Sequence, residues 1–98
     1  MRYATEFYPN TKVIGVHCEK RLPRISWLGI GEKATPEAEK LKAAIVAIPG
    51  VTEVTAYDYC LNVTRAGVFS WGEIEPAVLE VVREFFEADE LTPVAAFV

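Results

Sequence analysis

The residues in this chain best suited to chemistry are one histidine and two cysteines: His17, Cys18 and Cys60. A thiolate can act as a nucleophile or a metal ligand, and an imidazole can act as a base or a metal ligand near neutral pH. The two cysteines lie 42 positions apart, with no second cysteine at the short spacing of metal-binding motifs. Two cysteines are also too few for a disulfide scaffold. We therefore expect two reduced thiols and no cofactor.

The run 12–18 alternates like a β-strand, so adjacent residues in it point to opposite faces of a sheet. Cys18 shares a face with Ile14 and Val16 and is expected to pack as a small hydrophobic side chain. His17 is then expected on the other face, as a surface histidine beside a hydroxyl or a carboxylate.

Cys60 begins a second strand-like run, 60–65, in which Leu61 and Val63 take the core side. Cys60 is therefore expected on the sheet face opposite to Cys18. This parity disfavours both a disulfide and a shared metal site between the two cysteines. One alternative stays open: a small metal-binding or thiol-dependent protein that uses Cys18, His17 or Cys60.

Acidic side chains form a row at helical spacing, Glu80, Glu84 and Glu87. Together with Asp58 and Glu73 they could suggest paired carboxylates for acid–base catalysis. A row of glutamates on one side of an amphipathic helix is more typical of a solvated face. We therefore expect no enzyme. In its functional form, the row would be an acidic docking surface for a basic protein partner.

Large aromatic side chains are candidates for a partner surface. In the run 25–30 either Trp27 or Leu28 must face away from the core, because the two are adjacent in a strand. With Tyr57 and Phe97, this predicts an apolar area covered by a protein partner, by a second copy or by the tail. A homodimer would form through the open sheet face or the C-terminal tail.

Length and composition favour one domain over residues 1–98, with 51% hydrophobic residues and a formal net charge of −4. No apolar run approaches the roughly 18–20 residues that cross a bilayer, and the first residues lack the apolar core of a signal peptide. We expect a cytoplasmic protein that binds neither membrane nor nucleic acid. The charge is uneven: residues 1–34 carry six basic and three acidic residues, and residues 35–98 carry four basic and eleven acidic residues. The basic group Lys20, Arg21 and Arg24 could contact an anion, but it is interpreted as a solvated loop that keeps the hairpin soluble.

The elements that position these residues follow from periodicity and from helix signals. Residues 3–9 suit an extended segment, and the runs 12–18 and 25–30 predict a hairpin across the polar stretch 19–24. Thr35 is a helix N-cap before Pro36. The helix stripe is Ala38, Leu41, Ala44 or Ile45, and Ile48, and the helix ends at the pivot Pro49-Gly50.

The second half repeats this pattern, with strands at 51–57 and 60–65. Ser70 and Glu73 form a capping box before a helix. The tail 91–98 is either a fifth, edge-pairing strand or a disordered end. The order ββαββα predicts an α+β two-layer sandwich, an antiparallel sheet with two helices on one face.

Three blocks in this order resemble a known family. They are Ile48-Pro49-Gly50-Val51-Thr52-Glu53-Val54, Leu61-Asn62-Val63-Thr64-Arg65 and Trp71-Gly72-Glu73-Ile74-Glu75-Pro76, preceded by a shorter match at Pro9-Asn10-Thr11-Lys12-Val13. Their types and spacing are similar to the N-terminal domain of Nfu/NifU-type scaffold proteins of iron–sulfur cluster assembly.

The resemblance implies a fold and a setting of protein contacts around iron–sulfur biogenesis. In full-length family members a separate domain carries the C-x-x-C that binds the cluster, and this chain contains no C-x-x-C. No cluster ligand is therefore assigned. Tyr57 and Cys60 replace a glycine and a phenylalanine that are common near the hairpin of the family. The resemblance implies a non-enzymatic accessory or protein-interaction domain.

Overall fold

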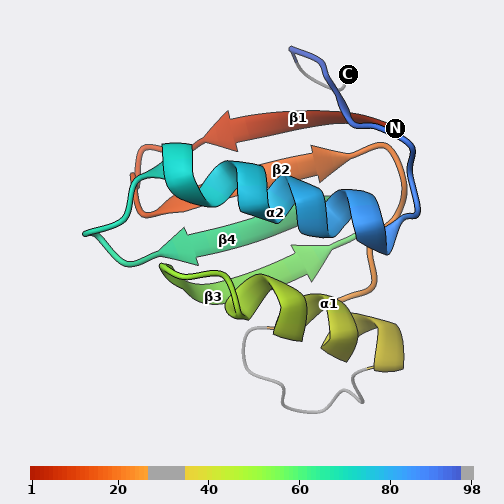
Figure 1. Ribbon diagram of the computed structural model, residues 1–98, viewed down its shortest axis with the longest axis horizontal. Coiled ribbons are helices and arrows are strands. Elements are labelled where there is room, and N and C mark those ends of the chain that lie inside the picture. The colour runs from red at the N-terminus through yellow and green to blue at the C-terminus, as the bar shows by residue number, and fades with distance from the viewer. Residues whose placement is uncertain (27–34, 96–98) are drawn as a thin grey trace.

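The computed structural model describes residues 1–26 and 35–95. The order of the elements is β1 (Arg2–Phe7), β2 (Val13–Cys18), α1 (Pro36–Val46), β3 (Val51–Tyr57), β4 (Cys60–Arg65), α2 (Trp71–Phe85) and β5 (Thr92–Pro93). Both helices lie against the same face of the sheet (Figure 1). This arrangement confirms the predicted α+β sandwich, its ββαββα order and a final strand.

The sheet has the strand order β3-β4-β2-β1-β5. The four longer strands are antiparallel neighbours, as predicted, whereas the two-residue β5 pairs in parallel with the start of β1. The sheet is therefore mixed. The tail takes this course because α2 returns the chain to the end of the sheet where β1 begins, as Figure 1 shows.

The predicted hairpin between 12–18 and 25–30 is wrong. β2 pairs with β1 on one side and with β4 on the other, so both of its edges are occupied. Ile25 instead makes an isolated bridge with Ala56 on the outer edge of β3. Leu22 and Ile25 are both buried, so they anchor to the core the segment 19–25 that runs from the end of β2 to the outer edge of β3, here called the crossing segment. The rest of the predicted strand, 27–30, lies outside the described residues.

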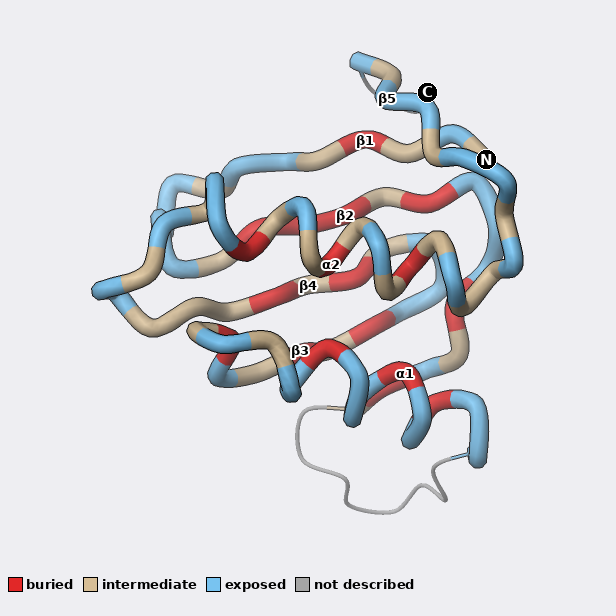
Figure 2. Tube along the Cα trace, in the orientation of Figure 1, coloured by how far each residue is buried: buried red, intermediate tan, exposed pale blue. Residues whose placement is uncertain are grey.

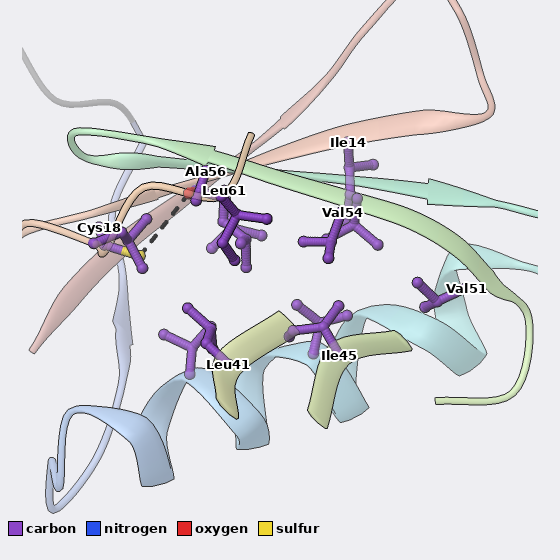
Figure 3. Close-up of a cluster of buried hydrophobic side chains, with 14 of the residues drawn as sticks. Ile14, Cys18, Leu41, Ile45, Val51, Val54, Ala56 and Leu61 are labelled. Carbon is purple, nitrogen blue, oxygen red and sulfur yellow. Dashed lines mark hydrogen bonds between the residues drawn. The ribbon is translucent and has the colours of Figure 1, made fainter. Parts of the chain in front are cut away.

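The core fills the space between the sheet and the helices, where the buried segments of both layers face one another (Figure 2). Cys18, Ile14, Val54, Ala56 and Leu61 come from the sheet side, and Leu41 and Ile45 point at them from α1 (Figure 3). The inward faces of the strands are therefore as alternation predicted.

The inward stripe of α1 is now resolved. Ala38, Leu41 and Ile45 are buried, whereas Ala44 is exposed and Ile48 is half-buried. Thr35 caps the helix as predicted, and its Oγ1 accepts a hydrogen bond from the Ala38 N–H at 3.1 Å.

Gly50 directs the chain from α1 into β3. Its φ of +96° lies in the region that glycine tolerates and other residues avoid. A Cβ at this position would lie 2.6 Å from the Phe69 ring, so the ring packs directly on the glycine backbone. The predicted pivot thus needs a glycine for two reasons, backbone conformation and close packing.

The N-terminus of α2 carries the predicted capping box. The Ser70 N–H donates to Glu73 Oε2 at 3.2 Å. On the inner side of the helix Ile74, Val78 and Val82 are buried, which fixes its orientation over the sheet.

Candidate functional site

The face of the sheet away from the helices carries a polar cluster around His17. The His17 Nε2 lies 2.8 Å from Glu6 Oε1 and 4.0 Å from Cys60 Sγ. His17 is paired with Cys60 across β2 and β4, and with Ala4 across β1 and β2. The prediction that His17 and Cys60 lie on this face, with His17 beside a carboxylate, is confirmed.

Tyr8 covers one side of the cluster. Its hydroxyl donates to Asn62 Oδ1 at 3.0 Å and lies 3.9 Å from Cys60 Sγ. The side chain can lie flat on the sheet because Gly15 beneath it has none: a Cβ on Gly15 would lie 2.3 Å from the Tyr8 hydroxyl. No local sequence pattern predicts this contact, since only the fold brings Tyr8 over Gly15.

The thiols are held in their protonated form. Burial, with a smaller effect of Cys60, raises the pKa of Cys18 to about 12. Burial also raises the pKa of Cys60, the hydrogen bond from Tyr8 opposes that rise, and the charge of Glu6 adds to it. Both cysteines are free. A raised thiol pKa is the opposite of what a cysteine nucleophile requires.

The geometry of the cluster also lacks a catalytic relay. In such a relay the base uses one ring nitrogen for the nucleophile and the other for the orienting carboxylate. Here the same nitrogen of His17 faces both Glu6 and Cys60. Within residues 1–26 and 35–95, no group of three histidine, cysteine or acidic side chains is placed to hold a metal ion.

A hollow lies beside this cluster on the same face. Its volume is about 270 Å³, and it is lined by Val13, Glu53, Thr55, Tyr57, Asn62 and Thr64. The lining comes from β2, β4 and β3, on the sides of these strands that point away from the helices. Tyr57, one of the predicted partner-binding residues, is 41% exposed at its rim.

The end of the β3–β4 hairpin combines arginines with tyrosines. The guanidinium of Arg24 lies over the Tyr57 ring at 5.3 Å from its centroid, and that of Arg21 lies over the Tyr59 ring at 5.4 Å. Arg21 also pairs with Asp58 at 3.5 Å. The basic group is exposed and outside helix and strand, as the interpretation as a solvated loop predicted, and the contacts of Arg21 and Arg24 with the two tyrosines were not predicted. Sequence reasoning could not pair residues 21 and 24 with residues 57 and 59, because the pairing depends on the crossing segment.

The acidic row on α2 is partly neutralised. Arg83 binds Glu80 at 2.5 Å and approaches Glu84 at 3.9 Å. Glu87 follows the helix with a positive φ of 52°. The use of Glu80, Glu84 and Glu87 as a docking surface stays a prediction. Trp27, the remaining predicted partner-binding residue, lies outside the described residues.

Comparison with known families decides the relationship. The family model described as "Scaffold protein Nfu/NifU N terminal" matches residues 3–89. The chain belongs to this family. The match spans the described fold from β1 to the end of α2, so this Nfu/NifU N-terminal domain contains the three blocks noted in the sequence within one structural unit.

Two solved structures share the fold of this Nfu/NifU N-terminal domain. A NifU-like protein from Saccharomyces cerevisiae, solved by NMR in solution, has a TM-score of 0.64 at 19% identity, covering 89% of this chain and 79% of that one. The crystal structure of protein SAV1430 from Staphylococcus aureus has a TM-score of 0.62 at 13% identity, covering 84% of this chain and 99% of that one. No curated protein matches the sequence significantly. Among the described residues, no helix is long and apolar enough to span a membrane.

Proposed function

We propose that this Nfu/NifU N-terminal domain is a non-enzymatic protein-interaction domain that acts in iron–sulfur cluster assembly. The observation that carries the proposal is the family match over residues 3–89, since the family is one of scaffold proteins. A further observation supports a non-enzymatic role. Burial raises the pKa of both thiols, which disfavours a cysteine nucleophile.

The surface offered to a partner is the open sheet face together with the end of the β3–β4 hairpin. Both helices lie on the opposite face, so this one is left to the polar cluster and the hollow (Figure 1). A partner that fills the hollow would contact Tyr57, Thr55 and Asn62. We propose a cytoplasmic location on the basis of the two free cysteines, since thiols stay reduced in that compartment.

The experiment that tests this function is removal of the chain from its host. We expect the specific activity of iron–sulfur enzymes, such as a [4Fe–4S] dehydratase, to fall and to recover when the wild-type chain is supplied. A dehydratase without a cluster, measured in the same extract, serves as control. Unchanged iron–sulfur enzyme activity in the deleted host under iron limitation would contradict the proposal.

A homodimer through the open sheet face or the C-terminal tail stays a prediction. The start of the tail already packs on β1, where the Val94 N–H donates to the Tyr3 carbonyl at 2.8 Å. Light scattering after size exclusion would distinguish a 10.9 kDa monomer from a particle of twice that mass.

A further inference from the structure

The end of the β3–β4 hairpin presents cations that are fixed on aromatic rings, and we propose that it binds an acidic peptide segment of a protein partner through its carboxylates. We call this surface the arginine–tyrosine patch, and define it as Lys20, Arg21, Arg24, Tyr57 and Tyr59. The proposal rests on the proposed role in protein contacts, but not on the link to iron–sulfur clusters.

The patch is held in place by the backbone. The Cys18 N–H donates to the Tyr59 carbonyl at 2.7 Å, and the Leu22 N–H donates to the Asp58 carbonyl at 2.6 Å. Further along, Ile25 and Ala56 exchange two hydrogen bonds of 3.0 Å each. Since Cys18, Leu22 and Ile25 are also buried, the segment 18–25 that carries the three cations is anchored at its two ends and at Leu22. A partner would therefore lose little backbone entropy in ordering it.

The side chains are positioned as well as the backbone. A guanidinium held over a ring loses part of its rotamer freedom, and Arg21 also lies 3.5 Å from Asp58, so a partner carboxylate would share this guanidinium with Asp58. Tyr59 is 48% exposed and Arg21 is 67% exposed in its side chain, so both can be reached from solvent. Arginine and tyrosine are the residue types that most often dominate the energy of protein interfaces.

The local charge of the patch indicates the charge expected on the partner. The sequence around the patch contains the cations Arg2, Lys20, Arg21 and Arg24 and the carboxylates Glu19 and Asp58, which gives +2 in a protein of net charge −4. Glu19 is bound to Arg2 at 2.6 Å, so its charge is already matched. The patch is thus locally positive on an acidic molecule. Carboxylates match the planar donors of arginine in bidentate pairs, and competition with phosphate and with an oligonucleotide separates them from phosphates.

The hollow beside the patch indicates in which direction a bound acidic peptide would run. Tyr57 lies under Arg24 and also lines the hollow, so the patch and the hollow form one continuous surface. A segment whose acidic residues face Arg21 and Arg24 can place its next side chain over Thr55 and Asn62. We therefore infer an acidic segment with a small or apolar residue beside its carboxylates.

The test is an NMR titration of the ¹⁵N-labelled chain with a twelve-residue peptide of alternating glutamate and leucine pairs at low salt. We expect shifts concentrated at residues 20–25 and 55–60, and affinity that falls as salt rises. The double variant Arg21→Glu/Arg24→Glu should bind on the order of tenfold or more weakly, since close charge pairs at interfaces contribute at least that much. The matched control is Lys40→Glu/Lys42→Glu, which makes the same charge change on exposed positions of α1 and should bind like the wild type.

Three outcomes would overturn the proposal. The first is shifts spread evenly over all basic residues, and the second is equal weakening by both double variants. The third is displacement of the peptide by equimolar inorganic phosphate or a single-stranded oligonucleotide, which would show a phosphate site instead. Unchanged iron–sulfur enzyme activity in a host that lacks this chain would contradict the proposed function but not the binding of the acidic peptide. Absence of peptide binding in the titration would contradict only the proposal that the arginine–tyrosine patch binds acidic peptides.

Discussion

At the scale of single residues, the position of Tyr8 on the open sheet face depends on Gly15. The Tyr8 hydroxyl occupies the place where a side chain on residue 15 would lie, and from there it covers Cys60. The cover of Tyr8 over Cys60 and its hydrogen bond to Asn62 therefore depend on a glycine at this point of the central strand.

Replacement of Gly15 by alanine should expose Cys60. The Tyr8 side chain must swing away and lose its bond to Asn62, while alanine suits a strand better than glycine does, so the free energy of unfolding should change by less than about 1 kcal/mol. The rate of Cys60 labelling by a thiol reagent should rise several-fold. Tyr8→Phe keeps the ring in place and should not raise it. Equal rates in Gly15→Ala and wild type would show that Tyr8 does not protect the thiol.

The burial of Cys18 should make the free energy of unfolding fall at alkaline pH. Burial raises its pKa from 9.0 to about 12 in the folded chain, so the folded state holds the proton more tightly than the unfolded state. The resulting stabilisation is complete below pH 9 and is lost as the pH rises from 9 towards 12, by up to about 1.4 kcal/mol per pH unit.

Urea unfolding at several pH values would measure this loss. The Cys18→Ala variant should show a shallower fall in the free energy of unfolding above pH 9, because one titrating group is gone. Tyr8, whose pKa burial also raises to about 12, contributes in part of the same range and remains in both proteins. Identical slopes in variant and wild type would show that Cys18 does not titrate as described.

At the scale of elements, the turn from α1 into β3 tests the pivot. Gly50→Ala places a Cβ against Phe69 and forces a non-glycine residue to a φ of +96°, so we expect a loss of about 1–3 kcal/mol in the free energy of unfolding. Gly67→Ala is the matched control, because the nearest atom to its Cβ would be Lys12 Cε at 4.0 Å. It should change stability by less than about 0.5 kcal/mol. Similar losses in both variants would argue against a special role for Gly50.

Local patterns predicted the elements well, and long-range pairing explains what they missed. The alternation of Ile14, Val16 and Cys18 gave the correct inward face, because the parity of a strand is a local property. The choice between Ala44 and Ile45 depended on how α1 lies over β3, and only the packed structure decides it for Ile45. The predicted pairing of β2 with the run 25–30 was wrong. It was chosen because that run is close in sequence, whereas the strands that pair with β2 are β1 and β4.

In the candidate site, too, local patterns predicted some features, and others depend on contacts between distant parts of the chain. Parity placed His17 and Cys60 on the open face, and a nearby carboxylate was expected. The cover of Tyr8 over Gly15 and the stacking of Arg21 and Arg24 on the hairpin tyrosines could not be predicted. Both features join segments whose spatial relation is set by the sheet order.

At the scale of the whole molecule, charge is separated between two regions. The outer side of α2 carries glutamates that partly pair with Arg83, and the end of the β3–β4 hairpin carries the arginine–tyrosine patch. The molecule is small, with a radius of gyration of 12.7 Å, so a partner on the open face would sense both regions. This separation favours one orientation of an acidic partner, with its charge towards the hairpin end and away from α2.

The most direct test of the central claim is a complementation measurement in a host that lacks this chain. The specific activity of a [4Fe–4S] dehydratase should be restored by the wild type and by Lys40→Glu/Lys42→Glu. It should stay low with Arg21→Glu/Arg24→Glu, and thermal unfolding of this variant should show that it is folded. Full restoration by Arg21→Glu/Arg24→Glu would contradict the claim that the domain acts in cluster assembly through contacts at the hairpin end of its open face.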